Sequence, residues 1–377
     1  MPSSIIFVDN CIVVLIFQIC FGNGFIMFRT HHARNAQECP KKEARLYPVK
    51  PSAPLIQLSK QLPSSVSLGC AGWNFLGWKG LVWDSNDEVK FLTNKTISAY
   101  AQHPLFKAIG IDRSYFDHFN EMDYVEMARF VEDDPHFKFL LKAPSSVTDC
   151  AIRDQKGRYQ SLNNDFLNVR MAMHDFVYPI INGLGEKAGP MIFQLAPIPQ
   201  PLLPTQKECY EYIDRITQFF TDLPKEVEGE TPVYGLEIRT PAIYTKRLLN
   251  QLRPTGVRLV VGIHPSMPNI ERQTAAQRFF EDPDAPGEHW QMSGPLIVRW
   301  ALNPHQRHGV GKFTYSPYNK MVHPDIDTRT GIAKLVAIAE ISQQKSYVIV
   351  NNKAEGCAPL SVVDLAKQIA YEIKKAS

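Results

Sequence analysis

Residues 234–265 read YGLEIRTPAIYTKRLLNQLRPTGVRLVVGIHP, and this stretch indicates the fold. Its two ends, YGLEIRT and RLVVGIHP, are short apolar runs that finish in polar residues. Such runs are typical of parallel strands that are covered on both faces. Between them, Leu248, Leu249 and Leu252 can share one helical face, and Thr240 followed by Pro241 predicts the helix start. The stretch is therefore a predicted strand–helix–strand unit with parallel strands.

The same pattern recurs along the chain from residue 64 onward. Eight apolar runs with polar endings show it: Val66–Trp73, Ala108–Tyr115, Phe137–Pro144, Pro190–Pro197, Tyr234–Thr240, Arg258–Pro265, Pro295–Leu302 and Tyr347–Lys353. Further helical patterns lie at Leu162–Ile181, Ile332–Ile341 and Val362–Ile373. Eight units predict an α/β fold of the (β/α)8 TIM-barrel type, a single domain over residues 63–377. An open doubly wound sheet is the alternative, but its GxGxxG fingerprint does not occur in the sequence.

The N-terminal extension divides into two parts. Residues 1–28 contain a mostly apolar run at 11–28, which is borderline in length for a transmembrane helix. Basic residues follow this run, so as a membrane anchor it would keep the rest of the chain in the cytoplasm. A wrongly assigned start codon is the other explanation of the run. Residues 29–62 are polar and proline-bearing without a sustained period, and they are predicted to be a linker.

Charge and cysteine content restrict the class of protein. A formal net charge of +3 gives no whole-protein field for nucleic acid, so any basic site must be local. The seven cysteines are scattered, odd in number and without a CxxC pair. This usage argues against a disulfide framework or a zinc ribbon and favours a reducing, cytoplasmic location.

Seven ordered segments carry a resemblance to a known family. They are Gly69–Trp73 with Trp78, Gly110–Phe116, Phe139–Pro144 with Val147–Thr148, Gly189–Pro197, Leu236–Arg239, Val298–Arg299, and Val350–Asn352 with Gly356 and Ala358. Together they resemble the landmarks of the YecE-like family, domain of unknown function 72. Asp112 and Arg113 depart from the commoner E-x-N form of the second landmark. The resemblance implies a TIM barrel, in agreement with the strand pattern, and it implies no substrate.

In a TIM barrel the C-terminal strand ends and the loops after them build the active site. The polar and aromatic residues that end the eight runs should therefore converge. They are Trp73, Asp112, Arg113, Lys142, Gln194, Glu237, Arg239, His264, Arg299, Asn351, Asn352 and Lys353. The loop Gly309–Tyr318, after the seventh strand, is a further candidate for a phosphate cradle.

Glu237 and Arg239 form the most informative pair of this set. They stand two residues apart, so both side chains face the same side of their strand. Two opposite charges inside a barrel are costly unless they pair or face a ligand. Arg299 is expected to point inward as well, if Trp300 packs outward. A purely structural ion pair is the alternative for Glu237 and Arg239.

The other candidates also have structural alternatives. Trp73 could be a core residue rather than a stacking platform, and His264 could be a hydrogen-bonded loop histidine. The amides of Gln194, Asn351 and Asn352 could satisfy loop backbone groups. Lys142 is expected to be solvated at the mouth.

The excess of cations over carboxylates predicts an anionic ligand, because guanidinium groups bind phosphate and carboxylate at two points. The first hypothesis is a hydrolase-like enzyme acting on an anionic, phosphorylated or nucleic-acid-derived substrate. Glu237 would be the acid–base residue, tuned by Arg239, and His264 the second proton carrier, with Asp112 as a further catalytic candidate. Arg113, Arg299 and the remaining mouth residues would bind the substrate.

Three alternatives remain open from the sequence. Asp112 and Glu237 could approach across the mouth as the two carboxylates of a glycosidase. A non-catalytic barrel could hold an anion or a nucleic-acid strand. A divalent metal has weak support: Asp112, Glu237 and His264 come from different strands without HxH or HExxH spacing, so no metal site is predicted.

Overall fold

The structure, a computed structural model, describes residues 5–8, 11–14, 45–90, 92–284, 290–305 and 314–376. Two compact units share the chain, Met1–Glu43 and Ala44–Ser377. In the first unit, β1 (Ile5–Val8) pairs antiparallel with β2 (Cys11–Val14). Residues 15–28, the larger part of the predicted apolar span, lie outside the described residues. No helix in the described part of the chain has the length and apolar character needed to span a membrane.

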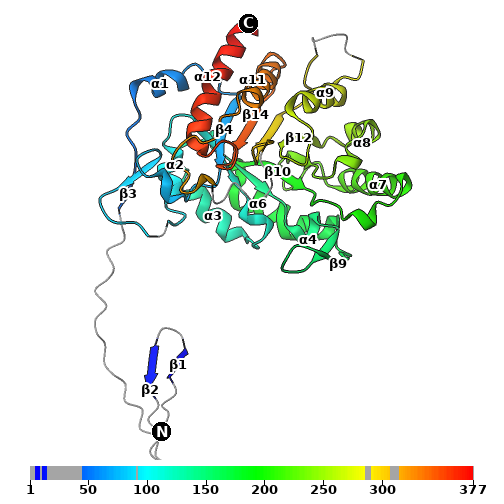
Figure 1. Cartoon of the computed structure of the whole chain (residues 1–377), viewed down its shortest axis with the longest axis horizontal. Coiled ribbons are helices and arrows are strands. Elements are labelled where there is room, and N and C mark those ends of the chain that lie inside the picture. Colours follow the sequence, from blue (N-terminus) through cyan, green and yellow to red (C-terminus); the bar gives the residue numbers. More distant parts are fainter. Residues whose placement is uncertain are drawn as a thin grey trace, which may run out of the picture. The chain divides into compact units, whose positions relative to one another are not determined.

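The second unit contains a closed barrel of eight parallel strands with helices around it (Figure 1). In chain order the barrel strands are β4 (Val66–Ala71), β6 (Phe106–Ile111), β7 (Lys138–Lys142), β10 (Ala188–Gln194), β11 (Tyr234–Glu237), β12 (Arg258–Ile263), β13 (Leu296–Trp300) and β14 (Ser346–Val350). Each strand pairs in parallel with its neighbours, and β14 closes the ring on β4. The predicted (β/α)8 fold and all eight predicted strands are confirmed.

The strands alternate between two apolar environments, which explains their continuous apolar sequences. The inner core is formed by Ala71, Ala108, Leu140, Ile192, Val260, Ile297, Tyr347 and Ile349. Residues of opposite parity, such as Val298 and Trp300 of β13, belong to the larger core between strands and helices. Trp300 is fully buried there. Arg299 lies between these two residues in sequence and shares the inward parity of Ile297.

Helices and turns connect the strands. The longer helices are α2 (Thr96–Ala101), α3 (Glu121–Arg129), α6 (Tyr178–Leu184), α7 (Gln206–Asp222), α8 (Lys246–Leu252), α9 (Ile270–Glu281), α11 (Ile326–Ile341) and α12 (Ala358–Ala376). Shorter turns are η1 (Leu76–Trp78), η2 (Arg113–Tyr115), α4 (Ser145–Thr148), α5 (Val169–Ala172), η3 (Met173–Val177), η4 (Gly185–Lys187), η5 (Gln200–Leu202), η6 (Pro241–Ile243) and η7 (Arg253–Thr255). The predicted helices at 332–341 and 362–373 are confirmed within α11 and α12.

Two predicted helix starts are wrong. Thr240 does not cap a helix: its hydroxyl accepts a hydrogen bond from the backbone N–H of Ile198, and Pro241 opens only the short turn η6. The helix α8 begins at Lys246, where the hydroxyl of Thr245 accepts from the N–H of Leu248. The helix predicted from Leu162 begins instead at Val169, because β9 (Tyr159–Leu162) forms a hairpin with β8 (Ala151–Arg153).

The predicted linker differs from the structure over its second half. Within it, β3 (Leu46–Pro48) pairs antiparallel with β5 (Trp83–Ser85), and α1 (Ala53–Ser59) lies beside α12. Both elements belong to the barrel unit, which begins at Ala44. A three-residue strand and a seven-residue helix are too short to produce a sustained apolar period, so the pattern could not reveal them.

Candidate functional site

A layer of charged side chains fills the C-terminal end of the barrel above the apolar inner core. Lys142, Gln194 and Glu237 end β7, β10 and β11, Arg299 comes from β13, and Arg239 follows β11. Each of these residues lies two positions after an inward-facing residue of its own strand or, in the case of Arg239, two positions after Glu237. The expectation that Glu237 and Arg239 share a side is confirmed, because Nη2 of Arg239 forms an ion pair with Oε1 of Glu237.

Glu237 is held between two arginines. Its side chain is fully buried, Oε1 pairs with Arg239, and Oε2 accepts a hydrogen bond from Nη1 of Arg299. A glycine on the neighbouring strand makes room for the carboxylate: a Cβ added at Gly262 would lie 3.1 Å from Oε1 of Glu237. This environment suits a permanently charged carboxylate that positions two guanidinium groups.

Arg299 connects the layer to the residue that follows β6. Its Nη2 donates to Oδ1 of Asp112 at 2.5 Å, while its Nη1 also donates to Oε1 of Gln194 at 3.0 Å. Gln194 accepts a second, longer hydrogen bond of 3.4 Å from Arg239. One guanidinium therefore joins both carboxylates of the site, and it lies between them.

The electrostatics keep both carboxylates ionised. Burial alone would raise the pKa of Glu237, but the guanidinium groups of Arg239 and Arg299 outweigh it and hold the pKa below the ordinary value. The pKa of Asp112 is also lowered: burial opposes this, and Arg299 and Lys142 prevail. Both carboxyl groups are therefore ionised at neutral pH, and Glu237 is in addition sealed between two arginines, so its predicted role as an acid–base residue gains no support from its surroundings.

The layer is short of negative charge and of hydrogen-bond acceptors. Two carboxylates face three cations, and both carboxylates are engaged by arginine. Nε and Nη1 of Arg239 are buried and have no hydrogen-bond partner among the described residues. Buried N–H groups without acceptors are costly, so the geometry leaves a place that an anion or ordered water would satisfy.

Lys142 is the cation of the layer that lacks a counter-ion. Its Nζ lies 3.9 Å from the centre of the Tyr115 ring, and within the described residues it forms neither an ion pair nor a side-chain hydrogen bond. Burial, followed by repulsion from Arg299, lowers the pKa of Lys142 to about 8. The expectation of a solvated lysine is corrected: the side chain is half-buried and packs on an aromatic ring.

Replacing Lys142 by methionine should raise the free energy of unfolding by about 1–2 kcal/mol near neutral pH. Below about pH 8 lysine carries its proton in both states, so the folded protein bears the full cost of the buried charge. That cost disappears as pH rises from about 8 to 10.5, the ordinary lysine value, because the folded state releases its proton first. Urea unfolding at about pH 7 and about pH 10 would measure the difference. A variant less stable than the wild type at both values would contradict the assignment.

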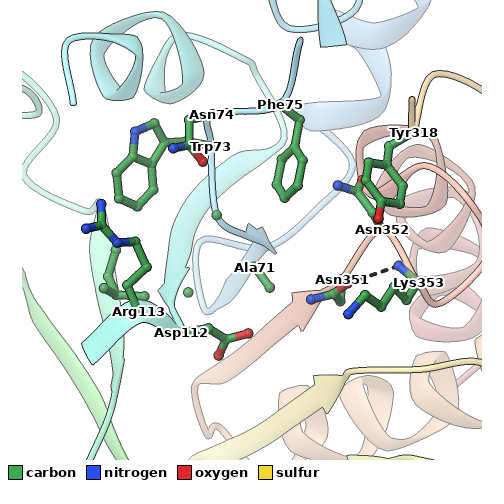
Figure 2. Close-up of a pocket in the computed structure, with 13 residues that line it drawn as sticks. Ala71, Trp73, Asn74, Phe75, Asp112, Arg113, Tyr318, Asn351, Asn352 and Lys353 are labelled. Atoms are coloured by element: carbon green, nitrogen blue, oxygen red, sulfur yellow. Dashed lines mark hydrogen bonds between the residues drawn. The ribbon is translucent and has the colours of Figure 1, made fainter. Parts of the chain in front are cut away.

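A pocket of about 380 Å³ opens beside this layer, above β4, β6 and β14. Figure 2 shows Asp112 at its floor, with Arg113 and Trp73 on one side and Asn351 and Lys353 on the other. The side chain of Asp112 is 39% exposed although Arg299 holds it. Asp112 is therefore the residue that the charged layer and the pocket share.

Several predicted ligand residues have structural contacts as well. Trp73 is 3% exposed and donates to the carbonyl of Thr93, so it is largely a core residue that gives one face to the pocket. The side-chain oxygen of Asn351 accepts from the backbone of Lys353. Asn352 accepts from Trp78 and from the backbone of Ala358. The oxygen of Asn351 thus satisfies a loop backbone group, as the structural alternative expected, whereas the oxygen of Asn352 is shared between a backbone N–H and the indole of the sequence-distant Trp78.

Arg113 and His264 lie at the margin of the arrangement. Arg113 lines the pocket, but its side chain is 62% exposed and its guanidinium pairs with Asp117 at 3.0 Å. Nδ1 of His264 lies 2.8 Å from the hydroxyl of Ser266, and the histidine is not among the residues that line this pocket. Among the described residues, no group of three His, Cys, Asp or Glu side chains could hold a metal.

Four residues of the site are not among those predicted from the sequence. Asn74 and Phe75 directly follow Trp73, Tyr115 lies within the second apolar run, and Tyr318 ends the predicted loop Gly309–Tyr318. Phe75 and Tyr318 contact each other edge to face across 5.6 Å, closing one wall of the pocket. Aromatic residues immediately after a strand end were the available signal for Phe75. Residues 309–313 of the loop lie outside the described residues.

Comparisons with solved structures give matches of low sequence identity. A DUF72 family protein from Thermotoga maritima MSB8 is 18% identical, covering 81% of this chain and 98% of that chain at a TM-score of 0.49. One from Enterococcus faecalis V583 is 15% identical, covering 82% and 97% at 0.47. A putative alpha-galactosidase from Bacteroides fragilis NCTC 9343 is 10% identical, covering 81% and 60% at 0.35. At these identities the likeness concerns the fold alone.

Sequence comparison gives the more specific result. No curated protein matches the chain. The family described as "Protein of unknown function DUF72" matches residues 67–377, the whole barrel from its first strand to the C-terminus. The seven landmark segments identified in the sequence fall within this match. The chain belongs to the DUF72 family, also called YecE-like.

Proposed function

We propose that this protein is a hydrolase-like enzyme that acts on an anionic substrate, one carrying a phosphate or carboxylate group, at the mouth of its barrel. The observation that carries the proposal is the uncompensated charge of the layer. Both carboxylates are already paired with arginine, whereas Lys142 has no counter-ion and Arg239 has two buried N–H groups without acceptors. A bound anion would supply what the site lacks.

The pocket supports a small organic anion rather than a bare ion. Phe75, Tyr318 and one face of Trp73 offer flat apolar surfaces, and Arg113 and Lys353 offer positive charge. Its volume of about 380 Å³ falls within the range of ligand sites in proteins. We expect the substrate to have a ring or other flat part next to its anionic group.

Asp112 is the residue that we assign to the chemistry. It is ionised at neutral pH, partly exposed at the floor of the pocket, and oriented by Arg299. In this position it would orient and deprotonate an attacking water. Glu237 is reassigned as a positioning residue, because its carboxylate is sealed between the two arginines. The role of His264 as a second proton carrier stays a prediction.

The engaged carboxylates also favour a second candidate, a non-catalytic barrel that binds an anionic small molecule or a nucleic-acid strand. Such a protein would keep the cationic layer and show no turnover. The glycosidase alternative has less support for Asp112 and Glu237, because the guanidinium of Arg299 occupies the space between their carboxylates. Retaining and inverting mechanisms both need that space for the substrate or a water.

Thermal unfolding of the full chain would test the anion site. The probes are inorganic phosphate, sugar phosphates, nucleotides, short DNA and RNA, and neutral sugars. A ligand at one hundred times its dissociation constant adds about 2.7 kcal/mol to the stability. We expect shifts with phosphate-bearing probes that decrease in Lys353→Gln. The control Lys207→Gln removes an 80% exposed lysine on α7 and should leave them unchanged. Shifts with neutral sugars alone would contradict the proposal.

Hydrolysis of para-nitrophenyl phosphate separates the enzyme from the binding protein. The enzyme should turn the probe over, and Asp112→Asn should lower the rate by about a hundredfold or more while phosphate still shifts the melting temperature. Phosphate-dependent stabilisation without turnover of phosphate esters would favour the non-catalytic barrel.

A further inference from the structure

Asn352 holds a buried hydrogen-bond donor in one fixed orientation. The residue is 2% exposed, and its Oδ1 accepts from the indole N–H of Trp78 at 3.2 Å and from the backbone N–H of Ala358 at 2.8 Å. Both partners can only donate, so turning the amide round would place its NH2 group against two donors. The Nδ2 atom therefore keeps its place, where it is buried and has no hydrogen-bond partner among the described residues.

This unpartnered nitrogen belongs to the aromatic side of the pocket. Asn352 lines the pocket together with Phe75 and Tyr318. Phe75 also packs on Trp78, the donor to Asn352, with ring centroids 4.8 Å apart. Figure 2 shows the Asn352 amide beside the ring of Tyr318, with its nitrogen turned toward Phe75. The donor therefore lies where a flat ligand packed on these rings would present its edge.

A ligand must displace a covering group to reach this nitrogen, and Tyr318 is the group that can move. Its ring meets Phe75 edge to face with centroids 5.6 Å apart, which leaves no room for a third ring between them. Tyr318 is only half-buried, and its φ of +68° lies in the left-handed region that disfavours residues with a Cβ. Phe75, by contrast, is held by Trp78. A turn of the tyrosine ring would open this wall of the pocket.

We propose that the NH2 group of Asn352 selects a nucleotide whose ring carries a carbonyl oxygen on its edge, as uracil and guanine do. The ring would displace Tyr318, stack on Phe75 and accept a hydrogen bond from Nδ2 of Asn352. Cytosine and adenine carry an amino group at the matching position, which would set two donors against each other and leave the buried nitrogen unsatisfied. Lys353 and Arg113, which line the same pocket, would hold the phosphate.

This inference rests on the anion site proposed above and adds the substrate class, a phosphate ester of an oxo-substituted aromatic ring. Asn351 supplies a second fixed donor to the same pocket. Its Oδ1 accepts from the backbone N–H of Lys353 at 3.0 Å, so its NH2 group faces away from that contact. Ordered water would also satisfy Nδ2 of Asn352, but it would give no preference between the two kinds of ring.

Binding of matched nucleotides would test the inference. The probes are the monophosphates of uridine, cytidine, guanosine and adenosine, and calorimetric titration of the full-length protein would give their dissociation constants. Uridine and cytidine monophosphates share the sugar and the phosphate, so their comparison isolates the ring edge. We expect uridine monophosphate to bind at least about tenfold tighter than cytidine monophosphate, and guanosine monophosphate tighter than adenosine monophosphate by a similar factor. Equal affinities within both pairs would overturn the selection and retain the anion site. Failure of every nucleotide and of inorganic phosphate to bind would overturn both.

Two variants assign the selection to its residues. Asn352→Asp keeps the oxygen that Trp78 and Ala358 need and replaces the donor by an acceptor, so the preference for uridine monophosphate should vanish. A folded variant that kept the preference would contradict the role of Asn352. Because a new buried carboxylate can impair folding, Phe75→Leu gives an independent test. Without the stacking ring, both pyrimidine nucleotides should bind about fivefold or more weaker, at an unchanged ratio. The matched control Tyr371→Leu, at a 60% exposed position of α12, should change neither constant. Unchanged binding in Phe75→Leu would contradict the placement of the ring.

Discussion

Replacing Glu237 by glutamine should lower the free energy of unfolding by about 3–5 kcal/mol, the cost expected when one partner of a buried ion pair is removed. The carboxylate is fully buried and is the shared partner of Arg239 and Arg299. Glutamine keeps the shape of the side chain but leaves two guanidinium groups without its charge in a water-poor site. Urea unfolding at neutral pH would measure the loss, and circular dichroism would show whether the native state persists.

An exposed ion pair supplies the matched control. Asp214 is 53% exposed and pairs with Arg247 at 2.9 Å on the surface of the barrel unit. Asp214→Asn removes the same kind of charge and should cost less than about 1 kcal/mol. If Glu237→Gln and Asp214→Asn lowered the free energy of unfolding equally, Glu237 would not be the structural centre of the charged layer. A stable Glu237→Gln protein that lost only turnover would restore the acid–base role predicted from the sequence.

The barrel and its inward-facing charges could be predicted because both follow from local rules. Apolar runs with polar endings mark parallel strands, and residues two apart share a face, which placed Glu237, Arg239 and Arg299 inside. The contacts among them could not be predicted. Arg299 and Asp112 are separated by 187 positions in the sequence. Whether their side chains meet depends on how the strands are staggered around the barrel. The sequence of one strand does not determine that stagger.

Apart from the local hairpin of β8 and β9, the differences from prediction have a related cause, a contact from a segment that is distant in the sequence. The hydroxyl of Thr240 is used by the backbone of Ile198 and is therefore not available as a helix cap. The strand β3 forms only because Leu46–Pro48 meets Trp83–Ser85. Phe75 and Tyr318 build a pocket wall from loops whose sequences have no apolar period.

The mouth of the barrel combines a closed half with an open half. Glu237, Arg239 and Gln194 form a sealed network on the β10–β13 side, whereas the pocket lies above β4, β6 and β14. Asp112 belongs to both through Arg299. This division explains why the most informative motif in the sequence, Glu237 with Arg239, positions the site, while Asp112, the residue proposed for the chemistry, directly follows β6 on the side of the pocket.

Replacing Gly69 by alanine should lower the free energy of unfolding by about 4 kcal/mol or more. A loss of this size is enough to prevent recovery of folded protein from many expression hosts. A Cβ at this position would lie 1.9 Å from the backbone carbonyl oxygen of Ala108, on the adjacent strand β6. The register between β4 and β6 shifts at this point. The buried hydroxyl of Tyr100 bridges the irregularity by accepting from the N–H of Cys70 at 2.7 Å and donating to Ala108 at 2.9 Å. Alanine would force the strands apart and break this bridge.

Gly262→Ala provides the comparison, since its added Cβ would meet a side chain rather than a backbone. The nearest atom, Oε1 of Glu237, lies 3.1 Å away and can move by a few tenths of an ångström. We therefore expect a smaller loss, about 1–2 kcal/mol, measured by urea unfolding. Which of the two variants loses more unfolding free energy is a direct test of the register between β4 and β6. If Gly69→Ala were as stable as Gly262→Ala, strands β4 and β6 could not lie as closely as the structure places them, and the position of Asp112 at the end of β6 would have to be revised with them.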